Sequence, residues 1–237
     1  MRKPVTLIAG QRGSGHFGAR PYLREALQAT GARHPSALYV GAANGDDRGF
    51  GAALCVLLTT AGAGRVFWPE LAGRRKRALT LAALESVDLV FVGGGGVEEG
   101  MRVLRDADLV GPLHAAAARG AVFAGLSAGS IMLGKRWVRW PDAQAEDREA
   151  ETYECLGLAP CSLDTHGEGD GWSEARSFAS VRANELGKKA YAYGVPSGAA
   201  LVVSPSGRAR ARGAPAPLFV AAPHRAARIE SVLAVAP

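Results

Sequence analysis

The pentapeptide Gly125-Leu126-Ser127-Ala128-Gly129 contains the residues that point most directly to chemistry. It is a Gly-x-Ser-x-Gly motif between an apolar run and a segment of small residues. Where a strand turns sharply into a helix, flanking glycines let neighbouring backbone pass close by, and a serine presents its hydroxyl at the sheet edge. Backbone N–H groups and the helix dipole then favour a developing oxyanion. Ser127 is therefore the candidate nucleophile, and a plain Gly/Ser-rich turn is the alternative.

A serine hydroxyl is a weak nucleophile and needs a base within hydrogen-bond reach. His166 lies downstream of the serine motif, in an irregular region of the kind where catalytic loops collect. It is the best base candidate by elimination, with a surface-loop histidine as the alternative. The other four histidines are less well placed on the expected topology: His16, His34, His114 and His224.

Four consecutive glycines, residues 93–96, follow an apolar run and precede a helical pattern. Without Cβ atoms, their backbone N–H groups can point at a ligand. Together with the N–H of Ala128, this loop can form an oxyanion hole. A flexible turn is the alternative.

The length and composition are typical of a folded globular protein. Of 237 residues, 48% are hydrophobic and 21% are charged, so a core can form, and one domain over residues 1–237 is the simplest expectation. The net charge is +6, but basic residues are not interleaved with aromatics, which gives no support for nucleic-acid binding. We expect no membrane span and no metal site. The three cysteines, Cys55, Cys155 and Cys161, indicate reduced thiols and a cytoplasmic protein.

Apolar runs and helical patterns alternate along the first half of the chain. Alternation of this kind predicts an α/β fold with a mostly parallel sheet sandwiched by helices and ligands at the carboxyl ends of the strands. Strands are expected at residues 5–9, 37–41, 65–68, 89–92 and 121–126, and helices at 22–30, 50–60, 76–86 and 97–119, the last broken near residues 111–112. Residues 137–174 read as irregular. A helix at 174–188, strands near 191–195, 199–204 and 218–222, and a turn or hairpin edge at 208–217 follow.

Taken together, these segments resemble the peptidase E and cyanophycinase family of serine peptidases. The matching segments are residues 89–96, the Ser127 motif, residues 156–158 leading to Asp164-Thr165-His166, and residues 193–203. The resemblance covers roughly residues 85–205. It implies the class I glutamine amidotransferase-like (flavodoxin-like) α/β fold. A glutamine amidotransferase itself is disfavoured, because that chemistry uses Cys where this chain has Ser127.

The resemblance implies that Ser127 is the nucleophile and His166 the general base, with oxyanion N–H groups from Gly95 and Ala128. Family members cleave next to acidic residues, so a dipeptidase-like exopeptidase for short aspartyl peptides is expected. No metal or organic cofactor is implied. The expected partner is a small acidic peptide, and a homodimer is left open.

The sequence departs from the family at two positions. Gly96 replaces the Asn that usually ends the glycine-rich loop, and Ser197 replaces a Glu that would orient the histidine. In peptidase E, an aspartate between the nucleophile and the histidine has also been proposed as the third residue of the catalytic triad. Asp142 occupies the similar place, so it is the candidate for that role here. Asp164 and Asp170 are less favoured substitutes. Loss of an orienting acid can cost about 10⁴-fold in rate, so a slow or inactive member is an open alternative.

Recognition of an acidic substrate needs a cation, preferably a bidentate arginine. Arg176 and Arg182 follow His166 on the expected helix, in the region where the family carries arginines. A solvated helix face explains them equally well. Two other functions stay open: a non-catalytic ligand-binding protein with a degraded triad, and an esterase or amidase.

Overall fold

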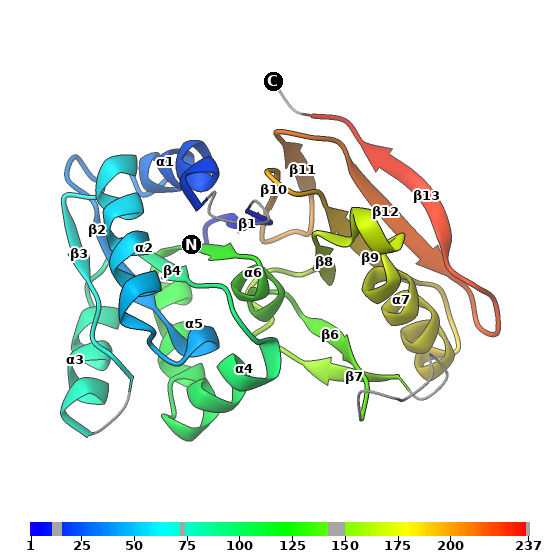
Figure 1. The fold of residues 1–237 in the computed structure, drawn as a ribbon, viewed down its shortest axis with the longest axis horizontal. Helices are drawn as coiled ribbons and strands as arrows, with labels where there is room; N and C mark the ends of the chain where they lie inside the picture. Colours follow the sequence, from blue (N-terminus) through cyan, green and yellow to red (C-terminus); the bar gives the residue numbers. More distant parts are fainter. Residues whose placement is uncertain (11–15, 72–73, 142–149, 236–237) are drawn as a thin grey trace.

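Five short apolar strands form the parallel part of a seven-stranded sheet. The computed structural model describes residues 1–10, 16–71, 74–141 and 150–235. All residues of β1, β4 and β5 are buried, as expected for parallel strands covered on both faces. The predicted strands are confirmed, and they lie in the order β3-β2-β4-β5-β1 (Figure 1). Their bounds are β1 (Val5–Ile8), β2 (Ser36–Val40), β3 (Arg65–Phe67), β4 (Leu89–Val92) and β5 (Val122–Leu126).

Helices cover both faces of this sheet. One face packs against α1 (Arg20–Gln28) and α2 (Arg48–Ala61), with Leu23, Leu54 and Leu58 in the shared core. The other face packs against four helices, which contribute residues such as Met101 and Met132 to the larger core. These are α3 (Arg74–Leu84), α4 (Val97–Asp106), α5 (Val110–Arg119) and α6 (Ala128–Leu133). The helix–sheet–helix sandwich is the predicted fold class.

The break between α4 and α5 lies earlier than predicted. The sequence places it near residues 111–112, but α4 ends at Asp106 and Asp108 adopts a left-handed conformation with φ 51°. Pro112 instead lies in the first turn of α5. A proline is tolerated there because first-turn N–H groups have no partner within the helix.

Two antiparallel strands extend the sheet beyond β1. The first, β10 (Ala200–Val203), pairs with β1, and β11 (Ala209–Arg212) pairs with β10 at the edge. The complete sheet is therefore mixed, although its site-bearing part is parallel.

The expectation that residues 137–174 are irregular was wrong in part. This region contributes to a two-stranded sheet of β6 (Arg136–Arg139) and β7 (Glu151–Glu154), and it contains β8 (Leu163–Thr165). Polar residues dominate β6 and β7, so they lack the apolar runs that marked the other strands.

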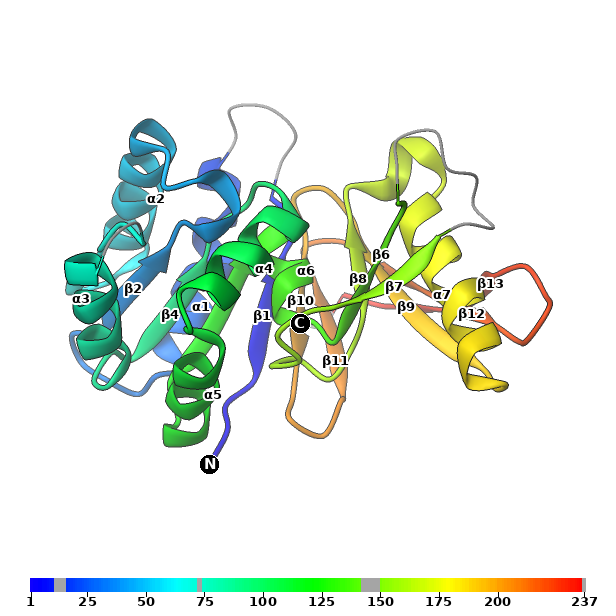
Figure 2. The same cartoon turned by 90° about the horizontal axis from the view of Figure 1, so that it is seen from below.

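A second sheet has the order β13-β12-β9-β8. Its remaining strands are β9 (Ala190–Val195), β12 (Ala216–Ala221) and β13 (Arg228–Leu233), and α7 (Ser173–Leu186) packs on it. A small core that includes Phe178 of α7 and Phe219 of β12 joins them. Figures 1 and 2 show this sheet and α7 on the opposite side of β10 from α1 to α5.

The three cysteines are free thiols. Burial raises the pKa of Cys155 and of Cys161 to about 12, so both stay protonated and unreactive near neutral pH. None of the helices in the described ranges has the length and hydrophobicity that a membrane crossing requires.

Candidate active site

Ser127 occupies a strained turn between β5 and α6. Its backbone has φ 51° and ψ −121°, a combination that L-residues rarely adopt. The turn is held by hydrogen bonds from the N–H of Ser127 to the carbonyl of Ile8 (2.7 Å) and from the N–H of Ser130 to the carbonyl of Ser127 (2.8 Å). The Ser130 hydroxyl also donates to the Ile8 carbonyl, at 2.9 Å. Ser127 is half-buried, whereas its neighbours on both sides are buried.

Both flanking glycines are required by close backbone packing. A Cβ on Gly125 would lie 2.6 Å from the carbonyl oxygen of Gly129, and one on Gly129 would lie 2.2 Å from the carbonyl oxygen of Val92. Both glycines of the Gly-x-Ser-x-Gly motif are therefore needed for close backbone contacts: Gly125 of β5 touches the start of α6, and Gly129 of α6 touches the end of β4.

A cavity of about 260 Å³ opens at Ser127. Its described lining comes from residues that follow the carboxyl ends of five strands: Gly10 after β1, Asn44 after β2, the Gly94-Gly95 pair after β4, Ser127 after β5 and His166 after β8. The structure thus places Ser127 and His166 in one cavity. Ala9, Phe50 and Leu126 complete the described lining.

The glycine-rich loop lies beside the serine. A Cβ on Gly94 would be 3.3 Å from Cβ of Ser127, so the loop approaches closely only because it lacks side chains. Gly95 has φ +144°, and a Cβ there would lie 1.9 Å from the carbonyl oxygen of Ala43. Gly96, the position where the family usually has Asn, is the N-cap of α4 and donates its N–H to Ala43 at 2.7 Å.

Asn44 fixes the orientation of this loop. Its Nδ2 donates to the carbonyl of Gly94 at 3.1 Å and to the hydroxyl of Tyr39 at 2.9 Å. Because a peptide unit is planar, holding the Gly94 carbonyl also fixes the direction of the Gly95 N–H. Asn44 was not among the residues predicted from the sequence. Its signal was its position just after an apolar strand, at the sheet edge where ligands bind.

Ser197 contacts the candidate base directly. Nδ1 of His166 lies 3.1 Å from Oγ of Ser197, and His166 itself has a left-handed backbone with φ 66°. The structure therefore places at the histidine the residue that replaces the usual Glu. A serine hydroxyl can accept from Nδ1–H and donate its own proton onward.

A carboxylate that the sequence analysis did not consider lies beside Ser197. Oε1 of Glu168 accepts from the backbone N–H of Ser197 at 2.5 Å, and Oε2 lies 3.4 Å from the Ser197 hydroxyl. Partial burial works against ionisation of Glu168, but hydrogen bonds from its own N–H and from Ser197, with the nearby His166, lower its pKa below the ordinary value. Glu168 follows His166 by only two residues, across Gly167, which was the available signal.

The two nearby aspartates considered as substitutes perform other tasks. Asp164 is 3% exposed, and its Oδ2 accepts from the N–H of Ala175 in the first turn of α7, at 3.3 Å. Burial first, then the charge of Glu174, raise the pKa of Asp164 to about 7. Asp170 accepts from the N–H groups of Trp172 (3.0 Å) and Ser173 (3.3 Å), where α7 begins. Asp142 lies outside the described residues.

The structure does not bring the two predicted substrate-binding arginines to the described lining of the Ser127 cavity. Arg176 is exposed on α7. Arg182, two turns further along, pairs with Glu185 at 2.6 Å and lines a different cavity. Within the described ranges, no group of three His, Cys, Asp or Glu side chains is placed to hold a metal ion.

Comparison with known proteins identifies the family. The model of peptidase family S51 matches residues 7–209, most of the chain. This chain belongs to peptidase family S51. As a family S51 member it is a peptidase, and the residues described above lie within the matched range. No curated protein sequence matches it.

Solved structures of peptidases share the family S51 fold seen here. A peptidase from an acI-B1 Actinobacterium aligns with a TM-score of 0.70 and 14% identity, over 99% of this chain and 97% of that one. A putative peptidase E protein from Listeria monocytogenes EGD-e aligns with a TM-score of 0.62 and 14% identity, over 90% of this chain and 98% of that one. At these identities the similarity concerns the fold.

Proposed function

We propose that this family S51 peptidase is a serine exopeptidase that hydrolyses short aspartyl peptides through an acyl-enzyme. The observation that carries the serine mechanism is the strained Ser127, which shares one cavity with His166 and the Gly94-Gly95 loop. Strain at a non-glycine residue is costly, about 1–3 kcal/mol, and such residues concentrate at functional sites. The preference for aspartyl peptides rests on the family resemblance.

In the proposed mechanism, Ser127 attacks the scissile carbonyl carbon while His166 takes its proton. Because Nδ1 of His166 faces Ser197, Nε2 is the nitrogen that receives this proton. The negative charge that develops on the carbonyl oxygen is stabilised by the N–H groups of Gly95 and Ala128. His166 then protonates the leaving amine, and the acyl-enzyme ester remains on Ser127.

Water completes the reaction by the reverse path. His166 accepts a proton from the water, which attacks the ester carbonyl, and the Ser127 oxygen leaves with that proton. Throughout, Ser197 and Glu168 orient the imidazole: Nδ1–H donates to the Ser197 hydroxyl, which donates to the Glu168 carboxylate. In this proposal Glu168, acting through Ser197, takes the place that the sequence analysis gave to Asp142.

One observation favours a second candidate, a hydrolase of neutral peptides or esters. The described lining of the Ser127 cavity has no Lys or Arg, and Phe50 and Leu126 give it an apolar wall. An acidic substrate side chain would need a cation to offset its desolvation.

One substrate panel tests both candidates. Asp-X dipeptides, the matched Asn-X dipeptides and a neutral activated ester would be incubated with the wild type, with Ser127→Ala and with Ser206→Ala, which changes an exposed serine of the β10–β11 turn. Cleavage of Asp-X in preference to Asn-X, lost only in Ser127→Ala, supports the aspartyl peptidase. Cleavage of the neutral substrates in preference to Asp-X supports the second candidate. Hydrolysis that persists in Ser127→Ala overturns the serine mechanism.

A further inference from the structure

A second cavity, of about 410 Å³, lies away from Ser127. Lys135, at its edge, follows the C-terminus of α6, whereas Ser127 precedes the N-terminus of the same helix. Ser162, in its wall, precedes β8, whereas His166 follows β8. The cavity is thus at the opposite ends of both elements that position the candidate catalytic pair. For a six-residue helix and a three-residue strand, this separation is about 9–10 Å.

The charged residues in the described lining of this cavity are all basic. Lys135 lies just before β6 and Arg136 begins that strand, Arg182 comes from α7, and Lys189 from the segment before β9. Its described lining includes no Asp or Glu. Like charges from three separate segments lie around a partly enclosed space, and an anion bound there would offset those that have no carboxylate partner.

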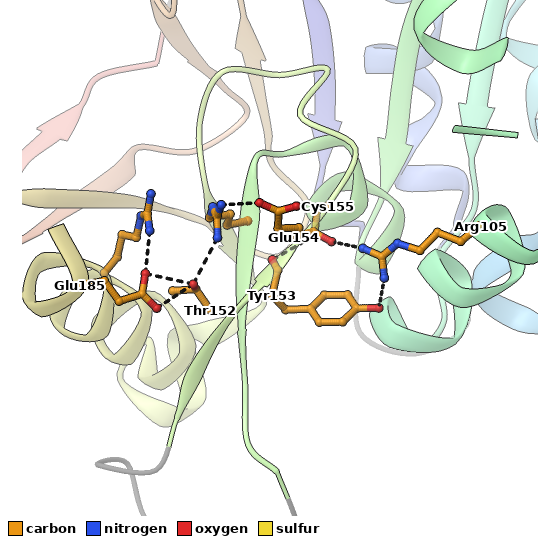
Figure 3. Close-up of polar contacts among 8 residues, drawn as sticks. Arg105, Thr152, Tyr153, Glu154, Cys155 and Glu185 are labelled. Carbon is orange, nitrogen blue, oxygen red and sulfur yellow. Dashed lines mark hydrogen bonds and ion pairs between the residues drawn. The ribbon is translucent and has the colours of Figure 1, made fainter. Parts of the chain in front are cut away.

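Carboxylates outside the described lining of the cavity pair with the two arginines. Arg182 pairs with Glu185 at 2.6 Å, and Arg136 pairs with Glu154. Glu185 also accepts from the hydroxyl of Thr152, at 2.8 Å. Figure 3 shows Thr152 and Glu154 of β7 with Glu185 of α7 in this network. These contacts orient the arginines at the side of the cavity.

The two lysines of the cavity differ from its arginines in their ion pairing. Among the described residues, Lys135 and Lys189 form no ion pair. Both are exposed, and both line the cavity. Their charges are therefore the ones available to a ligand.

The remaining wall is apolar and aromatic. Phe178 is 5% exposed, Tyr193 is half-buried, and Leu218 and Leu186 also line the cavity. The volume falls within the range of small-molecule sites. A ligand that fits has an apolar or aromatic body, which contacts this wall, and an acidic group, which reaches the lysines.

We propose that this cavity is a second binding site, separate from the Ser127 cavity, for a small molecule that carries a carboxylate or phosphate on an aromatic or apolar body. The site is independent of the proposed peptidase activity. Lys135 and Lys189 can bind either a phosphate or a carboxylate, and calorimetry with one probe of each kind distinguishes the two.

Calorimetry with four probes tests the chemistry of the ligand. The probes are phenyl phosphate, 3-phenylpropionate, the neutral 3-phenylpropan-1-ol and inorganic phosphate. We expect at least one aromatic anion to bind at least tenfold more tightly than both the neutral alcohol and inorganic phosphate. If neither aromatic anion shows this advantage over both comparison probes, the proposal is overturned. The tighter of phenyl phosphate and 3-phenylpropionate identifies the acidic group.

Matched variants and a location readout test the site itself. Lys135→Gln/Lys189→Gln should weaken binding of the aromatic anion at least tenfold, whereas Lys3→Gln/Lys188→Gln, which removes two exposed charges that are not in the described lining of the cavity, should leave it within twofold. Backbone amide shifts on binding should concentrate at Ser162 and Lys189. Equal losses in the two double variants, or shifts concentrated at Gly95 and Ser127, overturn the proposal.

Discussion

Oγ of Ser197, the residue that stands where the family usually has an orienting Glu, lies 3.1 Å from Nδ1 of His166. The same serine donates its backbone N–H to Glu168 at 2.5 Å, and its hydroxyl lies 3.4 Å from the second oxygen of that carboxylate. The chain thus has a carboxylate near the histidine after all, one hydroxyl further away. A carboxylate at this distance can still fix the tautomer of the imidazole. If the Ser197 hydroxyl donates to the Glu168 carboxylate, its oxygen is left to accept a hydrogen bond, and Nδ1 of His166 must then carry the proton that it donates.

We expect Glu168→Gln to lower kcat about 10–100-fold with a smaller change in KM, because the orientation of His166 acts on the transition state rather than on substrate binding. Ser197→Ala should have a similar effect. If the two residues act in series, the double variant should be no slower than the slower single variant. Steady-state kinetics on the best substrate of the panel measure this.

The control for that charge change is Glu85→Gln, an exposed glutamate just after α3. It should leave kcat unchanged. Strictly multiplicative losses in the Glu168→Gln/Ser197→Ala double variant would contradict a serial arrangement. Full activity in Glu168→Gln would remove Glu168 from the mechanism.

Asn44 should affect catalysis through the glycine-rich loop. In Asn44→Ala the Gly94 carbonyl loses its 3.1 Å hydrogen bond, so the Gly95 N–H is less well directed at the oxyanion. We expect kcat to fall about tenfold or more while KM changes little, since removing an oxyanion donor outright costs about 10²–10³-fold and a misdirected donor keeps part of its effect. Asn184→Ala is the matched control, because Asn184 accepts from the His224 N–H, far along the chain from the loop. A change in KM with kcat unchanged would instead make Asn44 a substrate-binding residue.

Much of the parallel sheet was predictable because its strands are buried on both faces. Runs such as residues 89–92 are then wholly apolar, and they end in glycines that mark the sheet edge. The Ser127 turn was predictable for a related reason. Only glycine fits at positions 125 and 129, so the close backbone contacts of the turn can be recognised from these two glycines in the sequence. These are local constraints.

The parts that sequence reasoning missed depend on contacts between distant segments. Glu168 is recognisable only when the loop after β9 brings Ser197 to it, and Asn44 only when β2 and β4 place its side chain against Gly94. The strands β6 and β7 pair through polar residues without an apolar run, so periodicity gave no signal there. Arg182 has the residue type expected for acid recognition, but the direction of α7 takes it to the other cavity.

Buried Asp164 should make the protein less stable as pH rises. Its pKa is about 7 in the folded protein, raised mainly by burial and then by Glu174, against an ordinary value of 3.8. Between about pH 4 and pH 7 the folded state therefore holds a proton that the unfolded state has released, and each increase in pH favours unfolding. Asp164→Asn should remove this contribution, because an amide oxygen can still accept from the Ala175 N–H.

Denaturant unfolding across pH 4–8 measures the effect. The wild type and Asp164→Asn should be similar near pH 4, and the variant should be the more stable near pH 8. Asp106→Asn, an exposed change on α4, should follow the wild-type curve. A variant that loses stability at pH 8 relative to wild type would show that the Asp164 charge supports the fold.

Packing at the Ser127 turn should make Gly129 intolerant of even a methyl group. In Gly129→Ala the new Cβ would lie 2.2 Å from the Val92 carbonyl oxygen and 2.6 Å from that of Gly93, both backbone atoms of the strand end and loop that flank the site. Neither can move without displacing β4 or the oxyanion loop, so we expect a loss of about 3 kcal/mol or more. Gly111→Ala is the matched control: it lies in α5 with nothing within 4 Å of the added Cβ, and should stabilise by about 0.5–1 kcal/mol. Thermal unfolding of the two variants should therefore move in opposite directions from wild type, and a Gly129→Ala protein with an unchanged midpoint would contradict the close contact between α6 and β4.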